Sequence, residues 1–500
     1  MNARVDVVVV GGGNAALCAA LSARESGAEV LVLERAPYDE RGGNSTFTAG
    51  AMRFAYQGNE EILALVDDLT DDQIARTDFG SYPEEKFFED LARVTENRTD
   101  PELADVLVSK SYDTLRWMHD KGVKFLPIYG RQAFEVDGRF TFWGGLTLEA
   151  LGGGPGLVDA LTKACEKAGV TIEYGARAGR LLRDDSGAIT GVELRQGGQV
   201  RTVESKAVVL GAGGFQSNVE WRTRYLGPGW DVAKVRGTRF NTGDGIRMAL
   251  EVGAAPWGQW SGAHAVGWEF NAPTFGDLSV GDGFQKHSYP WGVMVNADGR
   301  RFVDEGADFR NYTYAKYGRV ILGQPGQFAW QVFDQKVTHL LRDEYRIRQV
   351  TKVTGNTLEE LVTKMDGVDP AGFLAEIEAY NRAIDQDVAF NPNVKDGRRT
   401  NGLAVDKTNW ANTVDQGPFE AYQVTCGITF TFGGIRISPE AQVIDDDGRL
   451  IPGLFACGEL VGGIFYFNYP GGSGLTNGSV FGRIAGRGAA AVAAVAAVGD

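Results

Sequence analysis

Cysteine and histidine are scarce in this chain of 500 residues, which contains four of each. The cysteines show no close pairing in the sequence, so neither a disulfide framework nor an iron–sulfur cluster is expected. The spacing of His264 and His287 does not suggest a metal site.

Basic residues are outnumbered, with 50 lysines and arginines against 65 aspartates and glutamates and a formal net charge of −15. This balance disfavours nucleic acid or an anionic membrane as a partner. It does not exclude a small anionic substrate, because a local basic pocket can exist in an acidic protein.

Long hydrophobic runs are missing as well. The apolar run Val7–Val10 is too short to cross a bilayer, which takes about 20 apolar residues, and no basic stretch of a signal peptide precedes it. The C-terminal AAAVAAVAAVG is interpreted as a packed helix, with a membrane contact as the less favoured alternative. We therefore expect a cytoplasmic protein.

The sequence does contain a glycine-rich motif near its start, VDVVVVGGGNAALCAALSARESGAEVLVLER. An apolar β-branched run leads to Gly11, the pattern Gly11-x-Gly13-x-x-Ala16 follows, and a second apolar run ends at Glu34. This order predicts a βαβ unit that binds a dinucleotide. Gly11 permits the tight turn, Gly13 lets the backbone approach a pyrophosphate, and Glu34 can bind a ribose hydroxyl. A βαβ turn without a ligand is the alternative.

The length exceeds the usual limit of about 250 to 300 residues for a single core, so more than one domain is expected. The segment 268–410 is aromatic, charged and helix-rich, with TLEELVTKM and FLAEIEAYNRAI as amphipathic stretches. We predict an α/β fold in which a doubly wound, Rossmann-like domain, formed by 1–267 and 411–500, is interrupted by a smaller α+β capping domain at 268–410. We expect the active site where the domains meet.

Several elements of the Rossmann-like domain can be predicted. Gly152–Gly169 has the pattern of a helix, and Val170–Tyr174 that of the strand after it. Val192–Leu210 has the pattern of a β-meander interrupted by the turn QGGQ. It leads into a second glycine turn with Gly211 and Gly213, which we expect to pass beside the cofactor.

Two further glycine-rich segments bear on which dinucleotide is bound. Arg41–Thr46, RGGNST, resembles the flavin-contacting loop of the fumarate reductase and succinate dehydrogenase flavoproteins. Gly453–Glu459 resembles the closing motif of that family, in which the acid, here Glu459, holds the ribityl chain. The glycine-rich helix start at Gly471–Gly474 corresponds to amides that point at the pyrimidine edge of the flavin. Two distant segments closing on one nucleotide argue for FAD.

The residues predicted to bind FAD come from all of these segments. Asp244, in NTGDGIRMAL, is interpreted as a helix cap rather than a catalytic acid and is included among them. The complete set is Gly11, Gly13, Asn14, Ala15, Glu34, Arg35, Arg41, Gly42, Gly43, Asn44, Ser45, Gly211, Gly213, Asp244, Glu459, Gly474 and Leu475.

Longer segments make the resemblance more specific. GDGFQKHSYPWGVMVN, RRFVDEGADFRNYTYAKYG, VTCGITFTFGG and GGIFYFNYPGGSGLTNGSVFGRIAG resemble segments of tricarballylate dehydrogenases, a branch of that family. The resemblance covers nearly the whole chain. It implies an FAD enzyme that oxidises tricarballylate to cis-aconitate and passes electrons to a separate membrane-associated electron-transfer protein. The enzyme would then reach the membrane through that partner.

Departures from the wider family bear on substrate and cofactor. Fumarate reductases carry an arginine in the motif that reads Asn468-Tyr469-Pro470 here, and histidines where Thr429 and Phe430 stand. Without these dicarboxylate anchors, succinate or fumarate is not expected as the main substrate. Succinate dehydrogenases attach FAD through a histidine in the first flavin loop, where Asn44-Ser45-Thr46 offers none, so we expect non-covalent FAD.

Desaturation sends a hydride to flavin N5 and a proton to a base, so a basic group must face the substrate. Arg310 is our candidate, because it follows RFVDEGADF much as the catalytic arginine follows the RF-containing strand of fumarate reductases. An arginine acts as a base only with burial, nearby charges and a relay, for which Asp304, Glu305 or Asp308 could serve. Alternatively, Arg310 only clamps a carboxylate with its forked guanidinium.

Three more residues complete the predicted catalytic set. His264 lies in WSGAHAVGW, near where the family has a substrate-binding histidine, and His287 lies in QKHSYP beside Lys286. Tyr469 could donate a hydrogen bond to a carboxylate or a carbonyl. The alternatives are structural roles in the core for the histidines and aromatic packing for Tyr469.

Three functions remain open from the sequence. The first is a polycarboxylate desaturase acting on a small anionic substrate. The second is a 3-ketosteroid dehydrogenase or a related ene-reductase, because the tyrosine in YPGGSG resembles one that polarises a ketone. The third is a non-catalytic nucleotide-fold protein similar to GDP dissociation inhibitors. Arg310 and the Lys286-His287 pair favour an anionic substrate over a steroid, and the intact flavin loops argue against the third.

Overall fold

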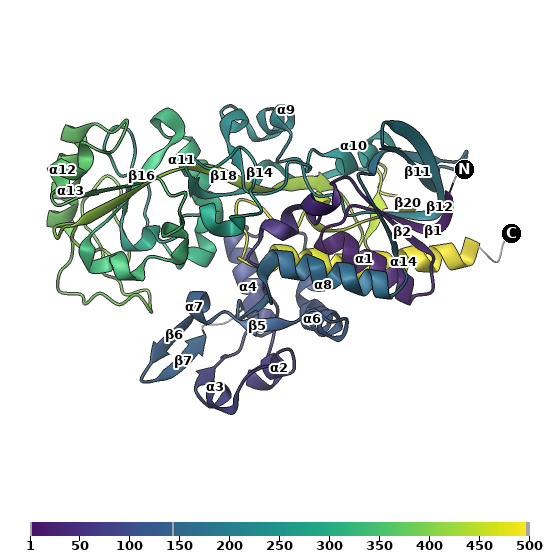
Figure 1. Cartoon of the computed structure of the whole chain (residues 1–500), viewed down its shortest axis with the longest axis horizontal. Coiled ribbons are helices and arrows are strands. Elements are labelled where there is room, and N and C mark those ends of the chain that lie inside the picture. The colour runs from purple at the N-terminus through teal and green to yellow at the C-terminus, as the bar shows by residue number, and fades with distance from the viewer. Residues whose placement is uncertain (1–2, 143–144, 497–500) are drawn as a thin grey trace. The chain divides into compact units, whose positions relative to one another are not determined.

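The computed structural model describes residues 3–142 and 145–496, and the chain divides into two compact units (Figure 1). The first unit comprises Met1–Gly227, Gly237–Ala263 and Phe430–Asp500, and the second comprises Pro228–Arg236 and His264–Thr429. The sequence placed the interruption at 268–410, which lies within the second unit.

The first unit is built on a sheet of eight strands within the described residues. Its centre is β1 (Ala3–Val10), which pairs in parallel with β2 (Val30–Glu34) on one side and β12 (Gln199–Leu210) on the other. The Val7–Val10 run in β1 is buried, as the interior of a parallel sheet requires. This arrangement confirms the predicted α/β fold.

The remaining strands of this sheet extend the centre on both sides. The order is β10-β11-β12-β1-β2-β9, with β20 parallel to β12 and β19 antiparallel to β20. The predicted meander is confirmed, because β11 and β12 form an antiparallel pair whose turn contains Gly197 and Gly198 with positive φ. The bounds are β9 (Thr171–Tyr174), β10 (Arg177–Arg183), β11 (Ile189–Gln196), β19 (Gln442–Ile444) and β20 (Leu450–Ala456).

Two helices of the first unit, α1 (Asn14–Glu25) and the C-terminal α14 (Ser473–Ala496), pack closely against each other (Figure 1). A Cβ added at Gly482 or Gly486 of α14 would lie 2.3 or 2.0 Å from a carbonyl oxygen of α1, so these glycines allow the contact. Of the alanine-rich stretch predicted as a packed helix, the part up to Ala496 continues α14, with Ala489, Ala490 and Ala493 buried and Val495 exposed, and the rest lies outside the described residues. No helix within the described residues is both long and apolar enough to span a bilayer.

Further helices and two small sheets complete the first unit. The predicted helix at Gly152–Gly169 is α8 (Gly153–Lys167), which leads into β9. The small sheets have the orders β3-β8-β5 and β4-β7-β6. Their strands are β3 (Ala51–Met52), β4 (Thr77–Asp78), β5 (Phe125–Pro127), β6 (Ala133–Val136), β7 (Arg139–Phe142) and β8 (Leu148–Ala150). The other helices are α2 (Asn59–Leu63), α3 (Asp71–Ala75), α4 (Glu84–Val94), α5 (Pro101–Ser109), α6 (Ser111–Asp120), α7 (Tyr129–Gln132), α9 (Val219–Trp221) and α10 (Asp244–Glu251).

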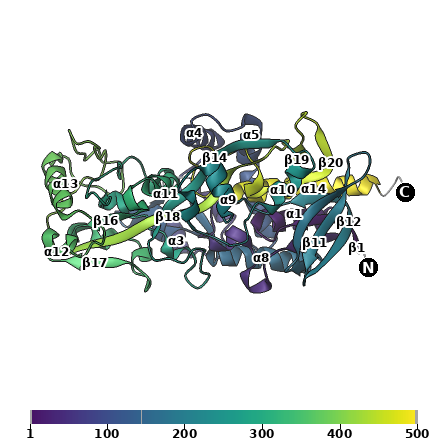
Figure 2. The same ribbon diagram turned by 90° about the horizontal axis from the view of Figure 1, so that it is seen from above.

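The second unit is organised around the long strand β18 (Phe419–Ile435). Figure 2 shows β16 and β17 along this strand, and both pair with it in antiparallel register. The sheet order is β13-β18-β16-β15, with β14 and β17 also paired to β18. The bounds are β13 (Lys234–Val235), β14 (Pro256–Glu269), β15 (Val293–Val295), β16 (Ala329–Phe333) and β17 (Lys352–Gly355).

Helices cover the core of the second unit with the amphipathic patterns that the sequence predicted. α13 (Pro370–Ala383) buries Phe373, Ile377 and Tyr380, which are spaced by one turn of helix, and these side chains join Trp330 of β16 in one apolar cluster. The remaining helices are α11 (Tyr314–Leu322) and α12 (Leu358–Val362).

Candidate active site

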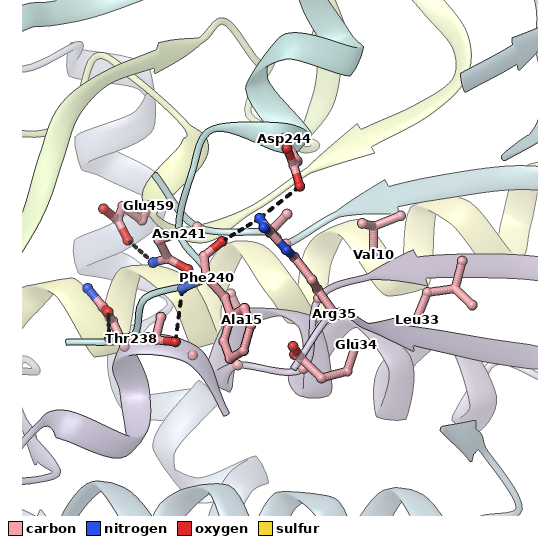
Figure 3. Close-up of a pocket in the computed structure, with 18 of the residues that line it drawn as sticks. Val10, Ala15, Leu33, Glu34, Arg35, Thr238, Phe240, Asn241, Asp244 and Glu459 are labelled. Carbon is pink, nitrogen blue, oxygen red and sulfur yellow. Dashed lines mark hydrogen bonds and ion pairs between the residues drawn. The ribbon is translucent and has the colours of Figure 1, made fainter. Parts of the chain in front are cut away.

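A cavity of the first unit opens where three parallel strands end. Residues at the ends of β1, β2 and β12 or directly after them contribute to its lining, among them Gly11, Glu34 and Gly211. Figure 3 shows the side chain of Glu34 among those that line the cavity. Gly11 has a φ of +112°, and a Cβ there would lie 2.4 Å from the carbonyl oxygen of Gly211. Only glycine allows these two turns to approach so closely. Ligands of open α/β sheets bind at this edge.

The start of α1 lies at the cavity. Gly13 is the N-cap and supplies no side chain, and Asn14 N donates a hydrogen bond of 3.0 Å to the Ser45 Oγ of the following glycine-rich loop. Asn14 and Ala15 line the cavity. Free N–H groups and the helix dipole at such an end favour a phosphate.

Glu34 closes the cavity at the end of β2. Its carboxylate accepts a hydrogen bond of 2.6 Å from the backbone N–H of Ala36, and a Cβ at Gly12 would lie 2.5 Å from Glu34 Oε2. Burial raises the pKa of Glu34, and the N–H groups of Ala36 and Gly12 oppose that rise. A carboxylate held at this point can accept a hydrogen bond from a ribose hydroxyl.

Two arginines meet Asp244 beside Glu34. Arg35 Nη1 lies 3.0 Å from the Asp244 carboxylate (Figure 3). Arg177 donates to both carboxylate oxygens at 2.8 Å. The interpretation of Asp244 as a helix cap was wrong, because Gly243 is the N-cap of α10 and the Asp244 carboxylate is engaged by the arginines. Asp244 does line the cavity.

Glu459 lies at the other end of the cavity, in the 3-10 turn η11 (Gly458–Leu460) (Figure 3). It accepts hydrogen bonds from the Thr431 N–H at 3.0 Å and from the Asn241 amide at 3.2 Å. Burial raises the pKa of Glu459 to about 7, although these donors oppose the rise. Asn44, in the loop predicted to contact the flavin, accepts a hydrogen bond of 3.0 Å from Thr238 N.

The structure places most of the predicted FAD residues on this one cavity, with four exceptions. Arg41 instead pairs with Asp159 at 2.5 Å, and Gly42 packs against Thr46 and Val158. Leu475 accepts a hydrogen bond from Asn14 through its carbonyl, and Gly474 lies against aromatic rings. The predicted residues that line the cavity are Gly11, Gly13, Asn14, Ala15, Glu34, Arg35, Gly43, Asn44, Ser45, Gly211, Gly213, Asp244 and Glu459.

Sequence reasoning missed three polar residues of the lining, Arg177, Thr238 and Asn241. Asn241 precedes Asp244 in the segment NTGDG, so that motif carried a signal for it. Arg177 had none, since it begins β10 and its partner Asp244 is distant in the sequence. The complete lining fits FAD: backbone donors stand between two buried acids, and glycines admit a ligand close to the backbone.

The second unit holds a separate cluster of two histidines and a tyrosine. The ring centroid of Tyr314 lies 5.0 Å from that of His264 and 4.9 Å from that of His287, with edge-to-face geometry. Burial lowers the pKa of both histidines well below 6.5, and Arg236 lowers both further. Both rings are therefore neutral near pH 7, and each can donate one hydrogen bond.

His287 is 2% exposed, and neither of its ring nitrogens has a hydrogen-bond partner among the described residues. Buried polar groups are normally paired. Such a ring is suited to hydrogen-bond a ligand, which agrees with the place of His287 in the predicted catalytic set.

Arg310 begins the 3-10 turn η7 (Arg310–Tyr312) and contributes to the electrostatics of His287. Burial and the neighbouring Arg342 lower the pKa of Arg310 to about 9, and Glu344 opposes this shift. Within the described part of the chain, the Arg310 guanidinium has no ion pair. The nearby Arg236, in contrast, is paired with Asp282 at 2.6 Å.

Lys286 does not join His287 as an anion-binding pair. Its side chain is fully buried 3.7 Å from the Glu269 carboxylate and donates to three backbone carbonyls, so that part of the argument for an anionic substrate is wrong. The predicted relay acids are engaged as well. Glu305 forms a buried ion pair with Arg301 at 2.6 Å, and Asp308 pairs with Lys395 at 3.5 Å.

Tyr469 lies in an aromatic group of the first unit. Its ring centroid is 5.2 Å from that of Phe430 and 5.5 Å from that of Phe465. Tyr469 and Phe430 are two of the positions at which the sequence departs from the fumarate reductase pattern. The group is apolar where that pattern would place charge.

A cavity lined by glycine turns at the ends of parallel strands defines the class of protein as one that binds a dinucleotide. Residues 6–475 match the family model described as FAD binding domain. A probable fumarate reductase of Shewanella frigidimarina is 31% identical over 492 residues, which cover 97% of this chain and 74% of the relative. The chain belongs to this FAD-binding family, among the fumarate reductase and succinate dehydrogenase flavoproteins.

Solved structures agree with this assignment. The open conformation of a flavocytochrome c3 fumarate reductase matches with a TM-score of 0.73 and 27% identity, covering 98% of this chain and 79% of that chain. A 3-ketosteroid Δ1-dehydrogenase from Sterolibacterium denitrificans shares the fold, with a TM-score of 0.75 and 20% identity over 98% of this chain and 99% of that chain. The chain is an FAD-dependent oxidoreductase that acts on CH–CH bonds, and the non-catalytic alternative is set aside.

Proposed function

We propose that this chain desaturates a polycarboxylate, with tricarballylate oxidised to cis-aconitate as the first substrate to test. The observation that carries the proposal is the second-unit cluster, in which Arg310, a cation without an ion pair among the described residues, stands in the electrostatic neighbourhood of the neutral, buried His287. His264, also neutral and buried, shares the cluster through the ring of Tyr314. Carboxylates are the ligands that an arginine fork and neutral imidazole N–H groups bind best. The aromatic group at Tyr469 supports a substrate other than succinate or fumarate.

Bound FAD supplies the hydride acceptor for this reaction at its N5 atom. Arg310 either takes the proton from the adjacent carbon or holds a carboxylate. Burial and the neighbouring Arg342 lower the pKa of Arg310 to about 9, which supports the base role. His264 and His287 donate hydrogen bonds to the remaining carboxylates without adding buried charge.

The cofactor and the electron acceptor belong to the same proposal. FAD is held without a covalent bond, because the loop around Ser45 provides no histidine. The two electrons of each turnover leave the reduced flavin to a separate membrane-associated electron-transfer protein.

The test is anaerobic bleaching of the flavin by a panel of substrates. Tricarballylate should reduce the flavin, and succinate should do so much more slowly. Fumarate added to dithionite-reduced protein provides the reverse assay. Rapid reoxidation by fumarate without bleaching by any polycarboxylate would refute the proposal.

A second candidate, a 3-ketosteroid-type dehydrogenase, is favoured by Tyr469 in its aromatic group. A flat apolar substrate would stack there, and the Tyr469 hydroxyl would polarise its ketone. Bleaching by a 3-ketosteroid that is lost in Tyr469→Phe would support this candidate. Retention of tricarballylate oxidation in the same variant would support the first.

A further inference from the structure

The segment Lys407–Trp410, which we call the strap, contacts two parts of the second unit that carry proposed catalytic residues. One part contains the 3-10 turn η6 (Tyr289–Trp291), just after His287, and the other is the loop that leads into Arg310. We propose that the strap is a positioning element that fixes the spacing between His287 and Arg310. This inference rests on the proposed function, because it takes both residues to act on the substrate.

Lys407 binds the His287 side of this arrangement. Its side chain is fully buried, and Nζ donates hydrogen bonds of 2.7 Å to the Pro290 carbonyl and 2.6 Å to the Gly292 carbonyl. A buried ammonium is costly unless such acceptors compensate it. The two carbonyls therefore hold the segment after His287 to the strap.

Asn409 and Thr408 bind the Arg310 side. Asn409 Nδ2 donates a hydrogen bond of 2.9 Å to the Gly306 carbonyl, and Thr408 Oγ1 donates one of 2.8 Å to Asp304. A Cβ at Gly306 would lie 2.2 Å from the Asn409 carbonyl oxygen. The loop thus touches the strap backbone directly, four residues before Arg310.

Trp410 contacts both sides at once. Its ring centroid lies 5.4 Å from that of Trp291 and 5.6 Å from that of Phe309, the residue before Arg310. Its φ of +57° is in the left-handed region, which is strained for a bulky residue. The ring is 1% exposed, and Nε1 donates to the Val394 carbonyl at 2.8 Å. Strain of this kind persists where the surrounding contacts over-determine the backbone.

These contacts reach the segment that follows His287 and the segment that precedes Arg310. A shift of either segment would change the geometry at the substrate, and misplacement by about 1 Å can reduce a rate by about 100-fold. The strap is therefore expected to affect turnover far more than FAD binding, since the FAD cavity is lined by first-unit residues.

The experiment compares Lys407→Met and Asn409→Ala with Asn401→Ala, an exposed position six residues before Lys407. Hydrogen exchange is measured on the FAD-loaded protein for peptides 285–292 and 304–312. Both peptides should exchange at least tenfold faster in the two strap variants and at the wild-type rate in the control. Flavin reduction at saturating tricarballylate should fall about 10- to 100-fold, with FAD affinity unchanged.

Two further measurements separate positioning from a general loss of structure. Lys407→Arg, which keeps a donor for the two carbonyls, should restore most of the rate. Combining Asn409→Ala with Arg310→Lys should cost little more than Arg310→Lys alone, because both changes disturb the same step. Faster exchange throughout the second unit, or fully additive losses, would overturn the proposal.

The outcomes also distinguish this inference from the proposed function. If no polycarboxylate reduces the wild-type flavin, the proposed function fails, and hydrogen exchange still decides whether the strap holds the two segments. If wild-type turnover is observed but exchange at both peptides is unchanged in the strap variants, the strap inference fails alone.

Discussion

The FAD cavity of the first unit and the histidine–arginine cluster of the second are built in opposite ways. The cavity is made largely from backbone, through glycine turns at the ends of β1 and β12 and the open start of α1. The cluster is made from side chains at His264, His287, Arg310 and Tyr314, which come from different segments. A backbone site leaves a spaced glycine pattern in the sequence, and a side-chain cluster leaves none.

Burial shifts pKa values in opposite directions in the two regions. It raises the pKa of Glu34 and Glu459 in the cavity, and it lowers the pKa of His264, His287 and Arg310 in the cluster. In each case the neutral form is favoured, because a low-dielectric surrounding disfavours charge. Hydrogen-bond donors oppose this effect at the acids, and nearby arginines reinforce it at the histidines.

The sharpest way to separate the two regions is Arg310→Lys, which keeps a charge but loses the fork of the guanidinium. Flavin reduction at saturating tricarballylate should fall by about 10²- to 10⁴-fold if Arg310 is the base. If it is only a clamp, substrate binding should weaken most. Stopped-flow reduction distinguishes these cases, with the exposed Arg300→Lys as the control. Wild-type behaviour in Arg310→Lys would contradict both roles.

Glu34→Ala tests the cavity, and here we expect weaker FAD binding with little change in turnover. Loss of charge-assisted hydrogen bonds, worth about 1.5–3 kcal/mol, should weaken FAD binding by about 10- to 100-fold. Turnover per bound flavin should stay near the wild-type value, because the ribose lies far from N5. Equilibrium titration of the apoprotein with FAD measures the first effect. Reduced turnover at full FAD occupancy would show that Glu34 has another role.

The neutral histidines predict a smaller, pH-dependent effect on stability. Their pKa values are lowered on folding, so the unfolded chain binds more protons once the pH falls below about 6.5. The free energy of unfolding should therefore decrease on acidification, by about 1.4 kcal/mol per pH unit for each histidine. Urea unfolding between pH 7.5 and 5.5 should show a shallower slope in His287→Gln. An unchanged slope would place His287 outside this linkage.

The last prediction concerns the release of FAD and requires no substitution. Denaturation in acid, followed by separation from small molecules, should leave the polypeptide colourless, because Ser45 cannot form the histidine linkage. Yellow colour retained by the polypeptide would contradict non-covalent binding.

Much of the first unit could be predicted from sequence. The βαβ start, the meander at Val192–Leu210 and the helix at Gly152–Gly169 all appear in the structure, because local periodicity and glycine turns determine them. Likewise, the glycine pattern and Glu34 located one end of the cavity. The bounds of the second unit were harder to predict. β14 and β18 each begin in one unit and end in the other, without a change in composition at the boundary.

Tertiary structure alone decided which polar groups face a ligand. Lys286 and His287 are neighbours in the sequence. Lys286 forms a buried ion pair with Glu269, whereas the His287 ring has no hydrogen-bond partner among the described residues. Arg177 and Asp244 are far apart in the sequence and form a paired carboxylate and guanidinium. By itself the sequence determined the nucleotide turns, because these depend on backbone conformations that glycine permits. The ionisation and pairing of the side chains depend on burial and distance, which exist only once the chain is folded.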